Sequence, residues 1–219
     1  MNRPLIPLVL ASALLAAAPF AASAQAAQPA AAATQGESAS KLVLDNSQRL
    51  LSTLESRRAE FTADRGKLQA FVASEFDKMF DRDYSARQVL GRHGRGASDA
   101  DVKLFADALA DSLMRRYGSS LLDFNTQLRV RVKSETPLPR GLGVKVSSEM
   151  LRQGGEPIPV DYLMRQTADG WRVFDVMVEG VSFVQTFRQQ FDTPLSRKSI
   201  REVAADLSAG RMQADAGTN

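Results

Sequence analysis

The sequence predicts an α+β domain in which helices come first, a run of strands follows, and two further helices close the chain. Two observations carry this prediction. Apolar residues recur at three- and four-residue spacing up to about residue 117, whereas from residue 128 they alternate with polar residues. A block of strands between two blocks of helices is typical of an antiparallel sheet with helices packed against it, and not of alternating parallel units.

The N-terminal residues are expected to lie outside this domain. Arg3 supplies a positive charge, residues 5–20 form an apolar run, and Ala22-Ser23-Ala24 is a small-x-small cleavage pattern. These are the three parts of a secretory signal peptide, so residues 1–24 are predicted to be removed. An N-terminal membrane anchor is the alternative.

Composition bounds the rest of the chain. Residues 25–40 are mostly Ala, Gln, Ser and Pro and are predicted to be a disordered tail, which leaves residues 41–210 as a single domain. Cysteine is absent and His93 is the one histidine, so disulfides and any His/Cys metal cluster are excluded. Without Arg3 the chain has 27 basic and 25 acidic residues, a balance that argues against a nucleic-acid partner. No later apolar run approaches 18 residues, so the mature chain is predicted to be soluble.

Helical periodicity predicts four helices before the strands and two after them. The clearest begins at Ser98, which stands three residues before Asp101 as in a capping box, and it ends near Gly118. The final residues, beyond Gly210, are predicted to be frayed. The predicted helices span approximately residues 41–59, 65–80, 83–91, 98–118, 183–191 and 194–207.

Alternation predicts a four-stranded antiparallel sheet, and the Asp169-Gly170 pair predicts a hairpin between its last two strands. The fourth strand is expected to place Trp171, Val173, Asp175 and Met177 on one face, and Phe174, Val176 and Val178 on the other. A strand that is apolar on both faces is covered on both sides, either by helices or by the wall of a cavity. The predicted strands span residues 128–133, 144–147, 158–165 and 171–178.

The residues offer little for catalysis. The run from Gly91 to Gly96 contains glycines and bases that could hold a phosphate, but it follows a helix and is expected to be an exposed loop. Asp161 and Asp175 lie in strands without a partner at a spacing that indicates acid–base chemistry, so salt bridges to arginines are expected. The run Glu179-Gly180-Val181-Ser182 is expected to be a corner between a strand and a helix. We therefore predict no catalytic residues and no metal site.

Two sets of residues form a specific pattern. The downstream set is Asp161-Tyr162, Gly170-Trp171-x-Val173-x-Asp175-Val176, Val178-Glu179-Gly180-Val181-Ser182 and Phe187-Arg188-x-x-Phe191. The upstream set is Tyr84, Ala86, Val89-Leu90-Gly91, Phe105, Leu109 and Tyr117-Gly118. This pattern resembles that of the MlaC, or toluene-tolerance, family, and the resemblance covers about residues 42–207. It departs from the family at His93-Gly94, where an aromatic residue is usual, and at Asp192-Thr193-Pro194-Leu195, where a glycine-rich segment is usual.

The resemblance implies a non-enzymatic periplasmic carrier whose cargo is glycerophospholipid and which needs no cofactor. Its implied partners are an inner-membrane ABC-type lipid transport complex and an outer-membrane lipoprotein–porin complex, and its implied role is to maintain the lipid asymmetry of the outer membrane. Two other classes remain open from the residues: a small-molecule cavity enzyme of the nuclear-transport-factor-like type, and a periplasmic adaptor or chaperone.

The lipid is expected to lie in an apolar pocket between the sheet and the helices. The fourth strand and the pocketed fold of the family motivate this expectation. The expected lipid-binding residues are Leu90, Phe105, Tyr162, Met164, Phe174, Val176, Val178 and Val181.

Overall fold

A computed structural model of the chain describes residues 38–118, 122, 128–152 and 154–216, all within the compact unit Gly36–Asn219. The predicted signal peptide and residues 25–37 of the predicted tail lie outside the described residues. Within the described part, no helix is both long and apolar enough to cross a membrane.

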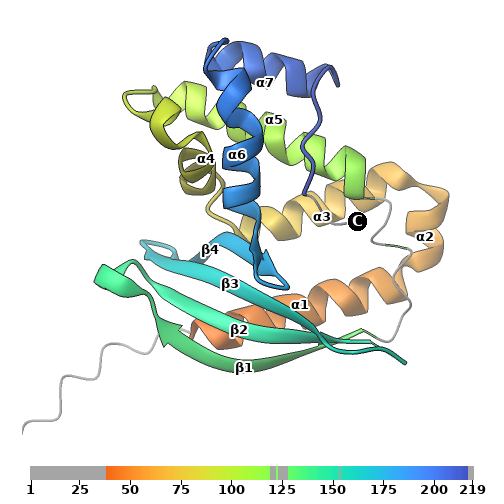
Figure 1. The fold of residues 1–219 in the computed structure, drawn as a ribbon. Coiled ribbons are helices and arrows are strands. Elements are labelled where there is room, and N and C mark those ends of the chain that lie inside the picture. Colours follow the sequence, from red (N-terminus) through yellow and green to blue (C-terminus); the bar gives the residue numbers. More distant parts are fainter. Residues whose placement is uncertain (1–37, 119–121, 123–127, 153, 217–219) are drawn as a thin grey trace, which may run out of the picture. The chain divides into compact units, whose positions relative to one another are not determined.

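The helices begin where short polar side chains cap them. Each capping Ser or Asp oxygen accepts a hydrogen bond from a backbone N–H of the first turn, which satisfies a donor that the helix itself cannot pair. The capping residues are Ser38, Asp64, Asp81, Ser98, Ser182 and Ser199. The helices are α1 (Ala39–Ser56), α2 (Arg58–Ala63), α3 (Arg65–Met79), α4 (Arg82–Leu90), the 3₁₀ turn η1 (Gly91–Gly94), α5 (Asp99–Tyr117), α6 (Phe183–Leu195) and α7 (Ile200–Ser208) (Figure 1).

Two predicted helix boundaries are wrong. The first predicted helix is broken at Arg57, which separates α1 from the short α2 and whose guanidinium lies 4.6 Å from the ring centre of Phe61. Pro194, predicted to open the last helix, lies in the last turn of α6. The last helix begins instead after Ser199, because Ser199 and Glu202 form a reciprocal capping box.

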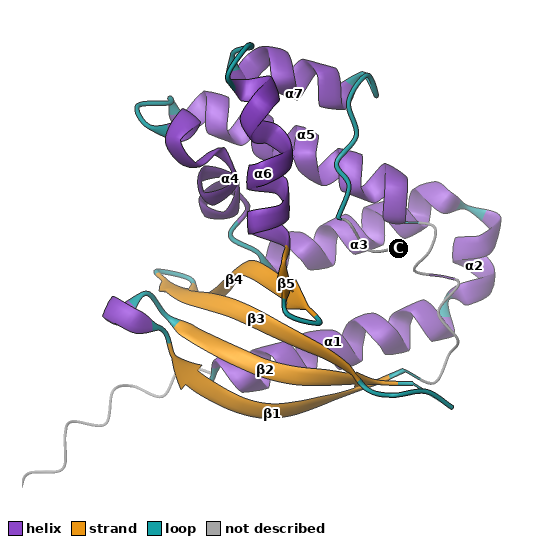
Figure 2. Ribbon diagram, viewed as in Figure 1, coloured by secondary structure: helices purple, strands orange, loops and turns teal. Residues whose placement is uncertain are grey.

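The sheet has five strands where four were predicted, with neighbours antiparallel in the order β1-β2-β3-β4-β5 (Figure 2). The extra strand follows a two-residue turn at Glu179 and Gly180, whose φ angles of 51° and 83° let Val181 pair with Val178. The predicted corner is therefore a tight hairpin that runs directly into α6. The strands are β1 (Arg129–Pro137), β2 (Val144–Leu151), β3 (Ile158–Thr167), β4 (Gly170–Val178) and β5 (Val181–Ser182).

A β-bulge corrects the predicted faces of β4. Val173 pairs with Met164 and Asp175 pairs with the preceding Leu163, so Phe174 is one extra residue in the ladder. Beyond the bulge the alternation is reset. Trp171, Val173 and Val176 consequently pack in one cluster on one face, which we call the inner face, and Val178 follows them by register.

The buried apolar residues that the structure describes fall into three clusters. The helical cluster joins α4, α5, α6 and α7 and contains Ala86, Val89, Leu90, Val102, Phe105, Ala106, Ala108, Leu109, Val184, Phe187, Phe191, Leu195, Val203, Ala204, Leu207, Ala214 and Ala216. The sheet cluster lies between α1 and the inner face and contains Ala39, Val43, Val146, Met164 and Val173. The α1–α3 cluster contains Leu54, Phe61, Leu68, Val72 and Leu122.

The C-terminal segment, residues 209–216, is bound to the domain, and the prediction that it frays is wrong. Ala214 is fully buried, and its backbone N–H donates to Ser112 Oγ at 3.1 Å. The Ala216 N–H donates to the Tyr117 hydroxyl at 3.0 Å. Side chains of α5 thus hold a segment about 100 residues away in the sequence.

Candidate functional site

The inner face of the sheet is packed at one end by α1. Met164 is fully buried in the sheet cluster, and Tyr162 and Val176 pack against that cluster. The Tyr162 hydroxyl hydrogen-bonds to Ser47 of α1, while burial raises the pKa of Tyr162 above its ordinary value. Three of the predicted lipid-binding residues therefore lie together where the sheet meets α1.

The other end of the inner face is less completely packed. Val178 pairs with Val160 of β3 on one side and with Val181 of β5 on the other, so the three side chains share one face. Val178 is half-buried and Val181 is 50% exposed. Among the described residues, none of the three clusters contains any of these valines. They form an apolar strip, which we call the valine strip, at the end of β4 that leads through β5 into α6.

Leu90 and Phe105 lie in the helical cluster, apart from the sheet residues with which they were grouped. The Phe105 ring meets Phe191 edge-on with ring centres 5.5 Å apart, and Leu90 is 1% exposed. Both side chains are enclosed by helices. The structure thus brings Tyr162, Met164 and Val176 together, Val178 and Val181 together, and Leu90 and Phe105 together, as three separate groups.

Phe174, the extra residue of the bulge, packs against α4. Its ring meets Tyr84 edge-on at 5.3 Å, and its carbonyl oxygen accepts a hydrogen bond from Ser85 Oγ at 2.8 Å. The guanidinium of Arg165 lies 4.3 Å from the centre of the Tyr84 ring and pairs with Asp81 at 2.8 Å. Phe174 is the last of the eight predicted lipid-binding residues to be placed, and it lies apart from Val176 and Val178.

The buried carboxylate of Asp175 fixes the hairpin to α6. Ser182 Oγ donates to one of its oxygens at 2.5 Å and the Val184 N–H donates to the other at 3.0 Å. Burial raises the pKa of Asp175, while these hydrogen bonds and the charge of Arg188 act in the opposite direction. Because both oxygens face the first turn of α6, this carboxylate holds a helix terminus in place.

Other charged residues have partners, but the prediction that Asp161 and Asp175 pair with arginines is wrong, because Asp175 is held by Ser182 and Val184 and Asp161 pairs with a lysine. Asp161 lies 3.6 Å from Lys145 Nζ. His93 Nε2 lies 2.9 Å from Asp192 Oδ1, and Arg92 binds the same carboxylate at 2.8 Å. The two places at which the sequence departs from the MlaC pattern are therefore in contact. Within the described ranges, no group of three or more potential metal ligands occurs.

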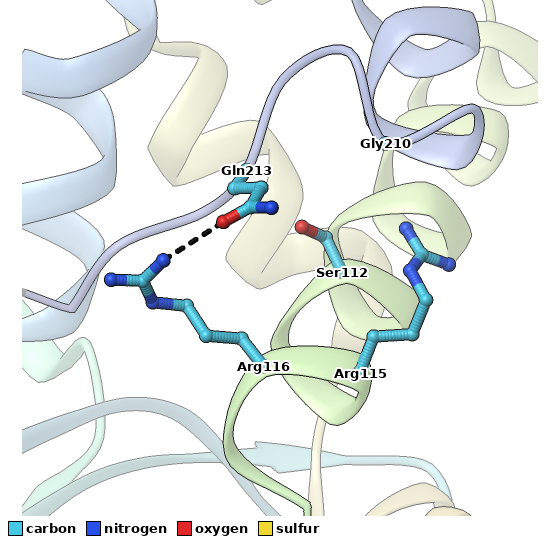
Figure 3. Close-up of a pocket in the computed structure, with 5 residues that line it drawn as sticks. All are labelled: Ser112, Arg115, Arg116, Gly210 and Gln213. Carbon is cyan, nitrogen blue, oxygen red and sulfur yellow. Dashed lines mark hydrogen bonds between the residues drawn. The ribbon is translucent and has the colours of Figure 1, made fainter.

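A cavity of about 290 Å³ lies between α5 and the C-terminal segment (Figure 3). The sequence did not predict this cavity, because Arg115 and Arg116 lie in the last turn of α5, where cations are favourable without any ligand. Only two features of the sequence could have indicated the cavity: the adjacent arginines in α5 and the small residues of the C-terminal segment. The lining residues are Ser112, Arg115, Arg116, Gly210 and Gln213.

The fold and the site define a class of protein: an α+β domain with an antiparallel sheet, an enclosed group of helices, and an apolar strip on the sheet that runs from the buried Val160 to the half-exposed Val181. The model of the MlaC protein family matches residues 44–209, and the chain therefore belongs to the MlaC family. This agrees with the resemblance found in the sequence.

Individual relatives are distant in sequence. The toluene tolerance protein Ttg2D of Pseudomonas putida is 23% identical over 175 residues, which are 76% of this chain and 80% of that protein. A phospholipid-binding protein from Ralstonia solanacearum, solved in complex with a phospholipid, superposes with a TM-score of 0.70 at 21% identity. That match covers 79% of this chain and 96% of the solved chain, and it shows that the two share a fold.

Proposed function

We propose that the protein is a periplasmic carrier that shuttles glycerophospholipids between the outer membrane and an inner-membrane ABC-type complex, and so maintains the lipid asymmetry of the outer membrane. Membership of the MlaC family supports the proposal, and so does the phospholipid in the related structure from R. solanacearum. The observation that carries it in this chain is the valine strip, Val160, Val178 and Val181, which extends the inner face beyond the sheet cluster.

Acyl chains would lie along this strip and reach Tyr162, Met164 and Val176 at the edge of the sheet cluster. A domain of this size usually has one contiguous core, whereas here three clusters are separate. Apolar chains of a ligand would fill the space that separate clusters leave uncovered. Leu90 and Phe105 are enclosed in the helical cluster, so a lipid would contact them only by displacing part of that cluster.

The energetic need for a carrier follows from the cargo. A diacyl lipid has roughly 30 methylenes, each costing about 0.8 kcal/mol in water, so free diffusion between membranes is negligible. An apolar site need only match the bilayer, because both environments exclude the acyl chains from water. Loading and release can then be nearly balanced, with the partner complexes of the two membranes setting the direction.

The cavity-enzyme alternative requires an acid or base that faces a bound substrate. Asp175, the buried carboxylate closest to the valine strip in sequence, instead turns both oxygens toward Ser182 and Val184. This favours a binding protein without catalytic residues.

Lipid extraction tests the proposal directly. Protein isolated from a periplasmic fraction is expected to carry phospholipid in a fixed molar ratio, measured by native mass spectrometry and by analysis of a solvent extract. Protein that is folded, comes from the periplasm and carries no phospholipid above the level of an unrelated secreted protein would contradict it.

A further inference from the structure

The cavity between α5 and the C-terminal segment lies outside the valine strip and has no role in the proposed function. None of its five lining residues is acidic, and two are arginines. Ser112 comes from the face of α5 that is buried, being only 3% exposed, whereas Gln213 and Gly210 come from the segment that crosses it. The cavity therefore exists only because this segment is bound along α5.

The two arginines have different partners. Arg116 binds Asp215 at 2.8 Å, the Gln213 side-chain oxygen at 2.9 Å and the Tyr117 hydroxyl at 3.1 Å, so its charge is balanced within the domain. Arg115 donates one hydrogen bond, at 2.7 Å, to the backbone oxygen of Leu207. Among the described residues, no carboxylate pairs with Arg115. One positive charge at the cavity therefore has no counter-charge in the part of the chain that the structure describes.

The neutral groups of the cavity also present donors. The side-chain oxygen of Gln213 is occupied by Arg116, which leaves its NH₂ group for another partner. Ser112 Oγ accepts from the Ala214 N–H, so its own hydroxyl hydrogen can be donated. Figure 3 shows the Gln213 nitrogen and the Ser112 hydroxyl facing each other, with the Arg115 guanidinium reaching toward Gly210.

A charged guanidinium beside two neutral donors matches the oxygens of a tetrahedral oxyanion. We propose that this cavity is a second ligand site, which binds a phosphate group through Arg115, Ser112 and the Gln213 amide. A volume of about 290 Å³ accommodates the phosphate with a small alcohol such as glycerol attached. The phosphate can belong to a free phosphate ester or to the head group of a lipid in a membrane surface.

The carbonyl ends of α5 and α7 lie close to the site and oppose an anion, since the C-terminus of a helix carries partial negative charge. We therefore expect a dissociation constant for inorganic phosphate on the order of 1 mM. A bound phosphate would join α5 to the C-terminal segment. It should consequently slow hydrogen exchange at the Ala214 N–H, which donates to the lining residue Ser112.

Two variants and a matched control test the site. Gln213→Glu keeps the oxygen that Arg116 binds but places a carboxylate in the cavity, and Arg115→Gln removes the unbalanced charge. Arg95→Gln is the control, because Arg95 is exposed and pairs with no carboxylate in the described part of the chain. Phosphate is titrated at constant ionic strength against chloride, with the Ala214 backbone amide followed by NMR in every protein and the Gln213 side-chain amide in those that keep Gln213.

Saturable shifts are expected in the wild type and the control, with about tenfold weaker binding in each cavity variant, as for loss of one charged hydrogen bond. A parallel arm measures binding to vesicles of phosphatidylglycerol and of phosphatidylcholine. Arg115-dependent binding to phosphatidylglycerol vesicles would identify a lipid head group as the source, and binding of free phosphate alone would identify a small ester. Absence of saturable binding in both arms, or equal binding by the wild type and both cavity variants, would overturn the proposal. Each variant's thermal unfolding is recorded, so that a loss of fold is not read as a loss of the site.

Discussion

The helical cluster and the inner face of the sheet use apolar residues in opposite ways. In the helical cluster, four helices and the C-terminal segment enclose large side chains such as Phe105 and Phe191 almost completely. On the inner face, packing is complete around Met164 but stops before Val178 and Val181. The two regions therefore contribute to different properties. An apolar side chain enclosed by its own chain stabilises the fold, whereas a partly exposed one can contact a ligand.

The largest effect should come from opening the helical cluster. Phe105→Ala removes a fully buried ring and is expected to lower the free energy of unfolding by about 3–5 kcal/mol, measured by denaturant titration. At Val181, where the side chain is half exposed, the change to Ala should cost less than about 0.5 kcal/mol. Equal losses at the two positions would erase the distinction between the regions.

The next effect falls on lipid content and leaves stability almost unchanged. Val181→Glu places a carboxylate on the valine strip, and desolvating that charge beneath an acyl chain is expected to reduce co-purified phospholipid about tenfold. Leu142→Glu is the matched control, because Leu142 is 54% exposed in the turn between β1 and β2. Phospholipid is quantified per mole of folded protein. An unchanged phospholipid content in Val181→Glu, or an equal loss in the control, would show that the lipid does not bind at the valine strip.

A third prediction concerns Asp175, which connects the sheet to α6 and so to the helical cluster. Asp175→Asn retains one acceptor oxygen but loses the other, and we expect a loss of about 1–3 kcal/mol at low pH. The pKa of Asp175 is higher in the folded chain than its ordinary 3.8. Between pH 3.8 and that raised pKa, the folded state therefore binds more protons than the unfolded state. The wild type should therefore lose stability from this group as the pH rises above 3.8, and its advantage over the variant should narrow. An advantage that widens with pH would show that the folded pKa is depressed instead.

The smallest effect is expected at the exposed junction of α2 and α3. Hydrogen bonds from Arg57 and Lys67 lower the pKa of Glu60 to about 2, so its contribution to stability is present above pH 4.5. That contribution is lost as the pH falls toward 2. Glu60→Gln should flatten this part of the dependence of the melting temperature on pH and leave lipid content unaltered. A pH profile identical to that of the wild type would show that these exposed pairs contribute nothing measurable.

The sequence predicted the class of fold because each long element repeats its own period. The helix from Ser98 and the Asp169-Gly170 hairpin lie where they were expected. The bulge at Phe174 escaped prediction because β4 is apolar at most positions, so an inserted residue changes no visible pattern. The fifth strand escaped because two residues show no period, and because glutamate is unusual at the positive φ of Glu179.

The candidate site was harder to predict than the fold. Hydrophobic pattern identifies a residue such as Leu90 or Val176 as inward-facing but does not say against what it packs. The eight predicted residues consequently divide among the helical cluster, the sheet cluster, the valine strip and, for Phe174, the contact with α4. The contacts of Ala214 and Ala216 could not be foreseen either, since small residues give no periodic signal and their partners are about 100 residues away.

The helical cluster is assembled from two pieces of chain that the strands separate. Its buried members lie in residues 86–109 and again in residues 184–216, with the whole sheet between them. Such long separations slow folding, because the loop must close before the contacts that reward closure can form. During synthesis, Phe105 has no complete surroundings until the last residues of the chain emerge. A chain that is cleaved, or whose synthesis stops, near residue 209 would thus have all the strands of its sheet but an incomplete helical cluster.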